Sequence, residues 1–323
     1  MNLHENKKLF ADAVTAASFP EDKGGLGIRD VFLEKDYWIT RSLKLLSESR
    51  DAPLCVFKGG TSLTKAFGLG YRFSEDIDIA ITHNPDRTDN QTKSLISRIC
   101  KTMSSGLEEV AKPDTRKFSK FRKVYYQYPR IESPIELSTI KSGLIQIETV
   151  AFANPYPYHK VSIGSLLRDF LLQNGMESIV SQYGMESFEL NMLDIRRTAT
   201  EKLVSLVRQS LADNYLTELR TKIRHFYDLH YLWHDETCKA YLQSRDFKED
   251  FARLLAEDQA RFAEPAGWQE KRLSESPLLK SFPNIWMELE AIYDKELSGL
   301  AFRTIPDASE VFGSFVEILE LLR

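Results

Sequence analysis

Residues 56–81 read VFKGGTSLTKAFGLGYRFSEDIDIAI, and the order of elements in this stretch decides the fold. A short apolar strand over 54–57 leads into a Gly-Gly turn, and a helix opens directly after the turn at Thr61-Ser62. A loop then connects the helix to a second strand over 76–81, in which acidic and aliphatic residues alternate. The stretch therefore predicts two neighbouring strands of one sheet, joined by a helix.

The second strand carries two carboxylates on one face. Successive side chains of a strand point to opposite faces, so Asp76 and Asp78 share one face while the isoleucines between them face the core. Two carboxylates about 6–7 Å apart on a partly buried face repel each other by roughly 2–3 kcal/mol at an effective dielectric constant near 20. Magnesium would offset this repulsion, because it takes one or two protein carboxylates and fills its other positions with water and phosphate oxygens.

The Gly59-Gly60 turn supplies the complementary feature. The free amides and the positive dipole at the start of the following helix suit a phosphate, and glycine lets that phosphate approach the backbone closely. The alternative interpretation is a solvated pair of aspartates at a strand edge, with the glycines serving only as a tight turn. Either feature alone would favour this alternative, whereas both together favour a site for a nucleotide and a metal ion.

These residues also resemble a known superfamily. A strand, Gly-Gly-Thr-Ser, a helix and then Ser-x-Asp-x-Asp is similar to the first signature of the DNA polymerase beta-type nucleotidyltransferases. More narrowly, KGGTSL at 58–63 and RFSEDID at 72–78 resemble the AbiEii/AbiGii toxin family, the toxin half of bacterial toxin–antitoxin and phage-defence pairs. The resemblance implies an α+β fold, in which a polymerase beta-type mixed sheet with helices precedes a mainly helical C-terminal lobe. The loop between the two motifs is longer than the family's usual spacing.

Composition limits the class of protein. The chain has 323 residues, of which 42% are hydrophobic and 28% charged, as in a soluble globular protein with two lobes. Its net charge of -4 means that any contact with nucleic acid needs a local basic patch. No apolar run approaches the roughly 18 residues of a membrane span, and no signal peptide opens the sequence, so we expect a cytoplasmic protein. The scattered Cys55, Cys100 and Cys238 are typical of reduced thiols.

Two helices are expected before the central stretch, over 5–18 and 29–47. The second contains VFLEKDYW at 31–38, and its ordinary interpretation is an amphipathic helix that packs its apolar side and exposes its charges. The same letters resemble the Glu-Lys-Asp-Tyr signature that precedes the catalytic core in AbiEii-type proteins. We interpret them as a mark of the family without a catalytic role.

A basic and aromatic segment follows an expected helix over 92–111. Residues 112–130 read KPDTRKFSKFRKVYYQYPR, in which lysine and arginine alternate with phenylalanine and tyrosine. This composition suits phosphate contact and base stacking, which makes the segment the best candidate for RNA contact. The alternative is a solvated hairpin strand, since KVYYQYP has a strand-like composition and charge runs usually form only surface.

A further alternating strand is expected over 144–152, where Gln146 and Glu148 share one face. In the superfamily that this chain resembles, a later strand beside the Asp-x-Asp strand often brings a third carboxylate to the metal ions. Glu148 is the candidate for that role, because the amide of Gln146 cannot replace a carboxylate. The alternative for Glu148 is an ordinary acidic residue at a strand edge.

A Pro- and Tyr-rich segment over 154–158 predicts a boundary between an N-terminal part, residues 1–153, and a mainly helical lobe, residues 154–323. A helix is expected over 197–211, opened by a capping box from Thr198 to Glu201, and another from about 218 onward. Further helical patterns, interpreted as a scaffold or a partner surface, cover 247–262, 285–297 and 309–322.

The first two of these helices carry a second resemblance. RTATEKL at 197–203 and RHFYDL at 224–229 resemble the second pair of AbiEii motifs, in which the lysine and the final aspartate join the active site. These residues correspond to Lys202 and Asp228. The ordinary alternatives are a solvated lysine and an aspartate that is satisfied by Arg224, four positions earlier on the same helix face.

The resemblance implies a Mg²⁺-dependent nucleotidyltransferase toxin, with Mn²⁺ as the alternative ion. It would transfer a nucleoside monophosphate from a nucleoside triphosphate (NTP) to RNA, with the tRNA 3′ end as the favoured acceptor, and so block translation. A cognate antitoxin is the implied protein partner, and no association with a membrane is expected. The alternatives are nucleotidylation or phosphorylation of a protein, or nucleotide binding without turnover. The expected catalytic residues are Asp76, Asp78, Lys202 and Asp228, the nucleotide-binding residues Lys58, Gly59, Gly60, Thr61 and Ser74, and the metal ligands Asp76, Asp78 and Glu148.

Overall fold

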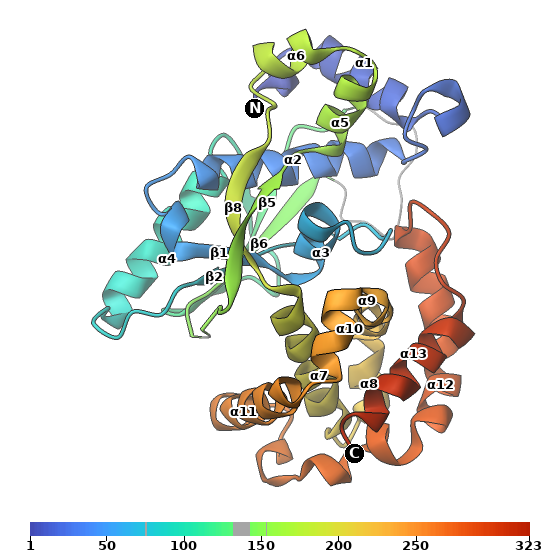
Figure 1. Cartoon of the computed structure of the whole chain (residues 1–323). Coiled ribbons are helices and arrows are strands. Elements are labelled where there is room, and N and C mark those ends of the chain that lie inside the picture. The colour runs from blue at the N-terminus through green and yellow to red at the C-terminus, as the bar shows by residue number, and fades with distance from the viewer. Residues whose placement is uncertain (75, 132–142, 153) are drawn as a thin grey trace. The chain divides into compact units, whose positions relative to one another are not determined.

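The structure is a computed structural model that describes residues 1–74, 76–131, 143–152 and 154–323 (Figure 1). Its elements bear out the α+β class predicted from the sequence. A mixed sheet with helices forms the first part of the chain, and the last part is helical. Within the described residues, no helix is both long and apolar enough to cross a bilayer.

The chain forms two compact units. Unit 1 comprises residues 1–68 and 73–193, and unit 2 comprises residues 69–72 and 194–323. The observed division therefore falls after residue 193, whereas the sequence predicted a boundary after residue 153. The difference arises because two further strands follow the Pro- and Tyr-rich segment and join the sheet of unit 1.

The described residues of unit 1 form one eight-stranded sheet in the order β3-β5-β6-β2-β1-β8-β7, with β4 paired to β5. The β2–β6 and β1–β8 pairs are parallel and the other pairs are antiparallel, so the sheet is mixed as predicted. The isoleucines of β2 are buried in the core. The strands are β1 (Cys55–Lys58), β2 (Asp76–Ile81), β3 (Glu108–Val110), β4 (Arg116–Lys117), β5 (Phe121–Gln127), β6 (Leu144–Val150), β7 (Tyr158–Ile163) and β8 (Phe188–Leu193).

Unit 1 also contains six α-helices among its described residues: α1 (Lys7–Ser18), α2 (Asp30–Ser47), α3 (Gly59–Phe67), α4 (Asp89–Met103), α5 (Leu166–Gln173) and α6 (Glu177–Gln182). Helix α4 is shorter than the helix expected over 92–111, because the chain turns after Met103 and enters β3. Helix α2 packs against α1, α4, α5 and the sheet. Its Glu34, Lys35 and Asp36 are buried, so the expectation that this helix exposes its charges is wrong.

Unit 2 is helical in its described elements: α7 (Ile195–Ser210), α8 (Tyr215–Arg220), α9 (Ile223–His234), α10 (Glu236–Leu242), α11 (Arg245–Arg261), α12 (Pro277–Leu300) and α13 (Ala308–Glu320). Its core includes the rings of Phe226, Phe282 and Phe315, with centroid separations of 4.7–6.0 Å. Helix α7 begins at Ile195 and is capped by Asp194, so the predicted capping box at Thr198 is wrong. Thr198 lies inside the helix, where its hydroxyl donates to the Asp194 carbonyl.

Candidate active site

A row of four charged residues crosses the middle of the sheet in unit 1. Strand pairing places Lys58 opposite Asp78, Asp78 opposite Glu148, and Glu148 opposite Lys123. Paired residues of neighbouring strands project from the same face, and all four side chains are partly exposed. Two carboxylates therefore stand between two lysines on one accessible face. Lys123 was not predicted as a site residue, since only the pairing of β5 with β6 reveals its position.

The start of helix α3 lies against this row. Gly59 has a φ of +80°, and a Cβ built on it would lie 2.0 Å from Oδ2 of Asp78. The carboxylate therefore occupies the space that any other residue would fill, and only glycine fits both the backbone conformation and the contact. The Thr61 hydroxyl donates to the Asp76 carbonyl at 2.5 Å. The first turn of α3 and the start of β2 are thus locked together.

This corner has the features of a phosphate cradle. Helix α3 begins at Gly59, two residues earlier than predicted, and the side chain of its N-cap residue Lys58 makes no capping hydrogen bond. The amides of Gly59, Gly60 and Thr61 form the first turn, where an anion is favoured by the helix dipole. Ser74 is half-buried in the loop that precedes β2.

The acidic residues suit a hard cation. Register places Glu148 beside Asp78 and Gln146 beside Asp76, so the third carboxylate stands next to only one of the pair. Within the described ranges, no three acidic, histidine or cysteine side chains already form a metal-binding group. Magnesium needs only one or two protein carboxylates and takes its remaining oxygens from water and phosphate. Asp76 and Asp78, beside the first turn of α3, fit this requirement.

Unit 2 contains a buried ionic triad. The Asp228 carboxylate accepts from Arg72 Nε at 2.8 Å, from Arg72 Nη2 at 2.7 Å and from Lys202 Nζ at 2.7 Å. Only 4–6% of each of these residues is exposed. Arg224, the alternative partner suggested by the sequence, instead approaches Glu296 at 3.7 Å. The structure thus brings Lys202 and Asp228 together and adds an arginine that was not predicted.

The triad has an excess of positive charge. Burial opposes ionisation of Asp228, but the charges and hydrogen bonds of Arg72 and Lys202 outweigh it and hold the pKa of this carboxyl well below its usual range. Burial and then the charges of Lys202 and Lys222 lower the pKa of the adjacent His225, which remains neutral. Among the described residues, the Lys202 ammonium donates to no acceptor other than Asp228. Two of its three N–H groups are therefore without an acceptor among these residues.

Arg72 belongs to a short segment of unit 2 that connects α3 to β2. The Tyr71 amide donates to the Tyr227 hydroxyl at 2.8 Å, and the Tyr71 carbonyl accepts from Phe302 N at 2.9 Å. Gly70 has a φ of +81°, and a Cβ there would meet the Tyr227 ring at 3.2 Å. The connection between the two halves of the first motif is thus held by α9 and by the chain that follows α12.

The basic and aromatic segment over 112–130 forms part of the sheet. Tyr125, Tyr126 and Tyr128 are buried, so the prediction that these rings stack on bases is wrong, because they pack in the core. Phe118 is 60% exposed. Three lysines of the segment lie in ion pairs, namely Lys117 with Glu109, Lys120 with Asp89 and Lys123 with Asp114. The hairpin-strand alternative therefore describes most of this segment.

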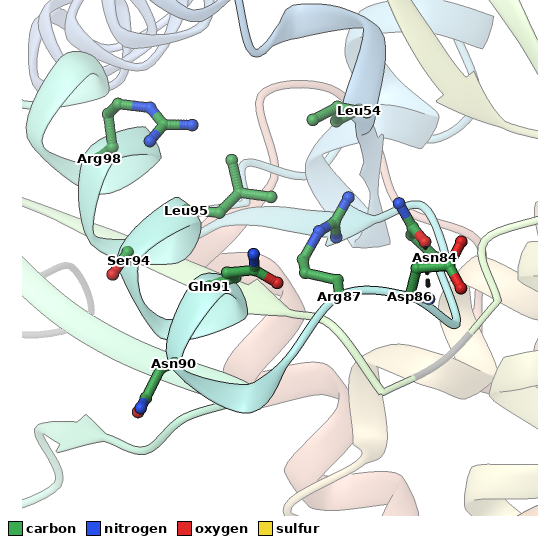
Figure 2. A pocket seen from close by; sticks show the side chains of 9 residues that line it. All are labelled: Leu54, Asn84, Asp86, Arg87, Asn90, Gln91, Ser94, Leu95 and Arg98. Carbon is green, nitrogen blue, oxygen red and sulfur yellow. Dashed lines mark hydrogen bonds between the residues drawn. The ribbon is translucent and has the colours of Figure 1, made fainter.

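A separate cavity of about 580 Å³ lies at the other end of β1 and β2 (Figure 2). Its lining includes Leu54, which precedes β1, and Asn84, which follows β2, together with side chains of α4. Arg98 of α4 is held by Asp51, with Nε–Oδ2 and Nη2–Oδ1 distances of 2.6 and 2.8 Å. Because β1 and β2 are antiparallel, Lys58 and Asp78 lie at the opposite end of the pair. The cavity is therefore not the candidate active site.

Comparison with known proteins identifies the family of this chain. The family described as nucleotidyl transferase AbiEii toxin, of a type IV toxin–antitoxin system, matches residues 41–303. No curated protein matches the chain. Among solved structures, the nucleotidyltransferase toxin MenT4 from Mycobacterium tuberculosis is 15% identical with a TM-score of 0.46, and the match covers 97% of this chain and 99% of that one. JHP933 from Helicobacter pylori is 17% identical with a TM-score of 0.38, over 83% of this chain and 94% of that one. The family match spans most of the sequence, so the chain belongs to the AbiEii nucleotidyltransferase toxin family.

Proposed function

We propose that this nucleotidyltransferase uses Mg²⁺ to transfer a nucleoside monophosphate from an NTP to RNA, with the tRNA 3′ end as acceptor. The proposal rests above all on the contact between Gly59 and the Asp78 carboxylate. That contact joins a candidate metal ligand to the N-terminus of a helix, which is the arrangement that a metal-bound triphosphate requires. Transfer to the tRNA end would prevent aminoacylation and so block translation.

In this mechanism Asp76 and Asp78 would hold the metal ion, with Glu148 beside Asp78. The amides of Gly59, Gly60 and Thr61 bind phosphate oxygens, and Lys58 and Ser74 flank them. When bound, Mg²⁺ neutralises charge on the triphosphate and on the departing pyrophosphate. The acceptor hydroxyl oxygen forms a bond to the α-phosphorus and its proton passes to solvent water, while the bond from that phosphorus to the bridging oxygen breaks and pyrophosphate leaves. The protein contributes mainly by position and by charge.

We assign Lys202 to charge neutralisation on the phosphates and Asp228 to the orientation of Lys202. Both oxygens of Asp228 accept hydrogen bonds from cations, and its pKa is depressed. Such a carboxylate is a poor proton acceptor, which argues against a role as the base for the incoming hydroxyl. The two remaining N–H groups of Lys202 support a role in binding an anion.

The acceptor and the biological setting rest on family membership. In unit 1, Lys123 is the basic-segment residue in the charged row, and its position favours contact with the acceptor backbone. We also propose Mn²⁺ as a substitute ion, a cytoplasmic location where tRNA and NTPs occur together, inhibition by a cognate antitoxin, and a role in phage defence.

The test is to incubate the purified protein with Mg²⁺, total RNA, candidate acceptor proteins and each α-³²P-labelled NTP in turn. We expect label in the tRNA band with the wild-type chain, and none with Asp76→Ala or Asp78→Ala when circular dichroism shows both variants to be folded. Label in a protein band would show that the acceptor is a protein and not RNA. Retained nucleotide without product would indicate a binding protein. Turnover by Asp76→Ala at the wild-type rate would refute the assignment of the carboxylates.

A further inference from the structure

A second buried ion pair lies behind the phosphate cradle. In unit 1, Lys65 Nζ of α3 is 2.6 Å from Asp36 Oδ1 of α2, and the two side chains are only 7% and 6% exposed. Asp36 belongs to the Glu-Lys-Asp-Tyr stretch that had no chemical role in the sequence. A buried pair of this kind adds little net stability, because desolvation of both charges offsets their attraction. Its placement therefore calls for a reason other than stability.

The pair connects three helices through hydrogen bonds that use every N–H group of the lysine. Besides Asp36, the Lys65 ammonium donates to Thr40 Oγ1 at 2.7 Å and to the Gly164 carbonyl at 3.2 Å. The second Asp36 oxygen accepts a hydrogen bond from the amide of Leu166 at 2.8 Å, and Leu166 is the first residue of α5. All three ammonium protons thus have an acceptor, and α3 is attached to α2 and to the start of α5.

Helix α3 is consequently held at both ends. At its first turn Thr61 donates to the Asp76 carbonyl and Gly59 touches the Asp78 carboxylate. Lys65 is one turn further along and on the same side of the helix as Thr61, because residues four apart share a face. The attachments at Lys65 fix the axis of the helix, and those at Thr61 fix its start.

We propose that Asp36 and Lys65 are positioning residues that fix α3 so that its N-terminal amides meet the phosphates of the bound nucleotide. This inference rests on the proposed function, since it concerns the same phosphate cradle. A shift of about 1 Å in a positioned group can cost on the order of 100-fold in rate. An apolar contact would hold the helix without defining its rotation as closely as three directed hydrogen bonds do.

The test compares Asp36→Asn with a matched control, Asp51→Asn. Both changes weaken a buried aspartate's ion pair in unit 1, but the partner of Asp51 is Arg98, which lines the cavity at the far end of β1 and β2 (Figure 2). Binding of ATP, GTP, CTP and UTP with Mg²⁺ is measured by calorimetry, well below the melting temperature of each variant. For the NTP that binds the wild type most tightly, we expect at least tenfold weaker binding to Asp36→Asn and less than a twofold change for Asp51→Asn.

A second measurement does not depend on the nucleotide. Hydrogen exchange of the full chain should become faster in residues 59–67 of Asp36→Asn and stay at the wild-type rate there in Asp51→Asn. If Asp36→Asn does not fold, Thr40→Val removes one acceptor of Lys65 more gently, and a threefold to tenfold loss of NTP binding is expected. Unchanged exchange in 59–67, or equal NTP affinity in both variants, would overturn the positioning role. A wild-type chain that binds no NTP would instead overturn the proposed function.

Discussion

The two units each bury a lysine–aspartate pair, but the pairs differ in how many N–H groups of the lysine already have an acceptor. In unit 1, Lys65 reaches three acceptors, and its charge is balanced by Asp36. In unit 2, Lys202 donates to Asp228, which also accepts two hydrogen bonds from Arg72. Among the described residues Lys202 has no further acceptor. This contrast supports the proposals that Lys65 belongs to the scaffold and that Lys202 binds an anion.

This difference separates two interpretations that the sequence could not separate. A lysine close to apolar residues of its helix is usually solvated or structural, and both Lys65 and Lys202 fit that description in the sequence. The surroundings of His225 show the same imbalance of charge around Lys202. Besides burial, the cations Lys202, Lys222 and Arg72 lower the pKa of His225, and only the carboxylate of Asp228 raises it. The Lys65–Asp36 pair is neutral and saturated, whereas Lys202 shares the single carboxylate of Asp228 with Arg72, which supports the proposed role of Lys202 in binding phosphate.

The largest effect is expected from breaking the saturated pair. Lys65→Met leaves the Asp36 carboxylate buried without its cation, which should lower the free energy of unfolding by about 3–5 kcal/mol. Urea denaturation followed by circular dichroism measures the change. The control is Lys120→Met, which removes a solvated partner of Asp89 and should change stability by less than about 1 kcal/mol. Equal effects of the two changes would show that the Lys65 pair is not a buried scaffold.

Removing the other lysine should instead affect activity. Lys202→Met leaves Asp228 bound to Arg72 at two points, so the fold should be retained. Loss of one charge aimed at the reacting phosphates typically lowers kcat by about 100-fold or more. Transfer of label from NTP to RNA measures the loss, with Lys222→Met as the control that removes a neighbouring positive charge outside the triad. Activity within threefold of wild type would place Lys202 in the scaffold beside Lys65.

A smaller effect tests how Asp228 orients Lys202. Arg72→Lys keeps the positive charge but loses the bidentate hydrogen bonding to Asp228, so the side chains of Asp228 and Lys202 become less constrained. We expect kcat to fall about tenfold while the free energy of unfolding falls by roughly 1–2 kcal/mol. Arg224→Lys is the matched control on α9, because Arg224 faces Glu296 in a half-exposed pair. If both variants keep wild-type kcat, the geometry of the triad has no influence on transfer.

Local pattern was sufficient for part of this molecule. Strand β2 spans the residues predicted, because alternation of acid and isoleucine marks a strand with one buried face. The neighbouring Gly59 turn could be placed beside Asp78 because strands that follow one another along the chain are commonly neighbours in the sheet. The Glu148 strand was expected at residues 144–152 and is observed at 144–150, and only its pairing with β2 shows which carboxylate it faces.

Other features depend on partners that are distant in the sequence. Arg72 and Asp228 are 156 positions apart, so no periodicity could reveal the triad. The charges of α2 look solvated in the sequence because their partners come from α3, α5 and the chain after β5. Strands β7 and β8 follow a Pro- and Tyr-rich segment that resembles a domain linker. In each case tertiary contact overrides the local signal.

The smallest effect is expected at Glu34, a carboxylate to which no cationic side chain of the described residues donates a hydrogen bond. Glu34 accepts a hydrogen bond from the Ile131 amide, and burial raises its pKa to about 7 against the pull of that bond and of Arg130. The folded chain therefore holds a proton that the unfolded chain releases above its ordinary pKa of 4.5. Stability from Glu34 is present below that value and is lost as the pH rises toward 7.

Glu34→Gln removes this titration and keeps a similar shape. Relative to the variant, wild-type stability should fall on the order of 1–2 kcal/mol between pH 5 and pH 7.5. Urea denaturation at several pH values measures the difference. A matched experiment on Asp228→Asn should give the opposite sign, because Arg72 and Lys202 depress the pKa of Asp228 and its contribution is lost only as the pH falls below 3.8. A difference between wild type and Glu34→Gln that stays constant with pH would mean that this carboxyl is ionised in the fold, and that its environment resembles that of Asp228.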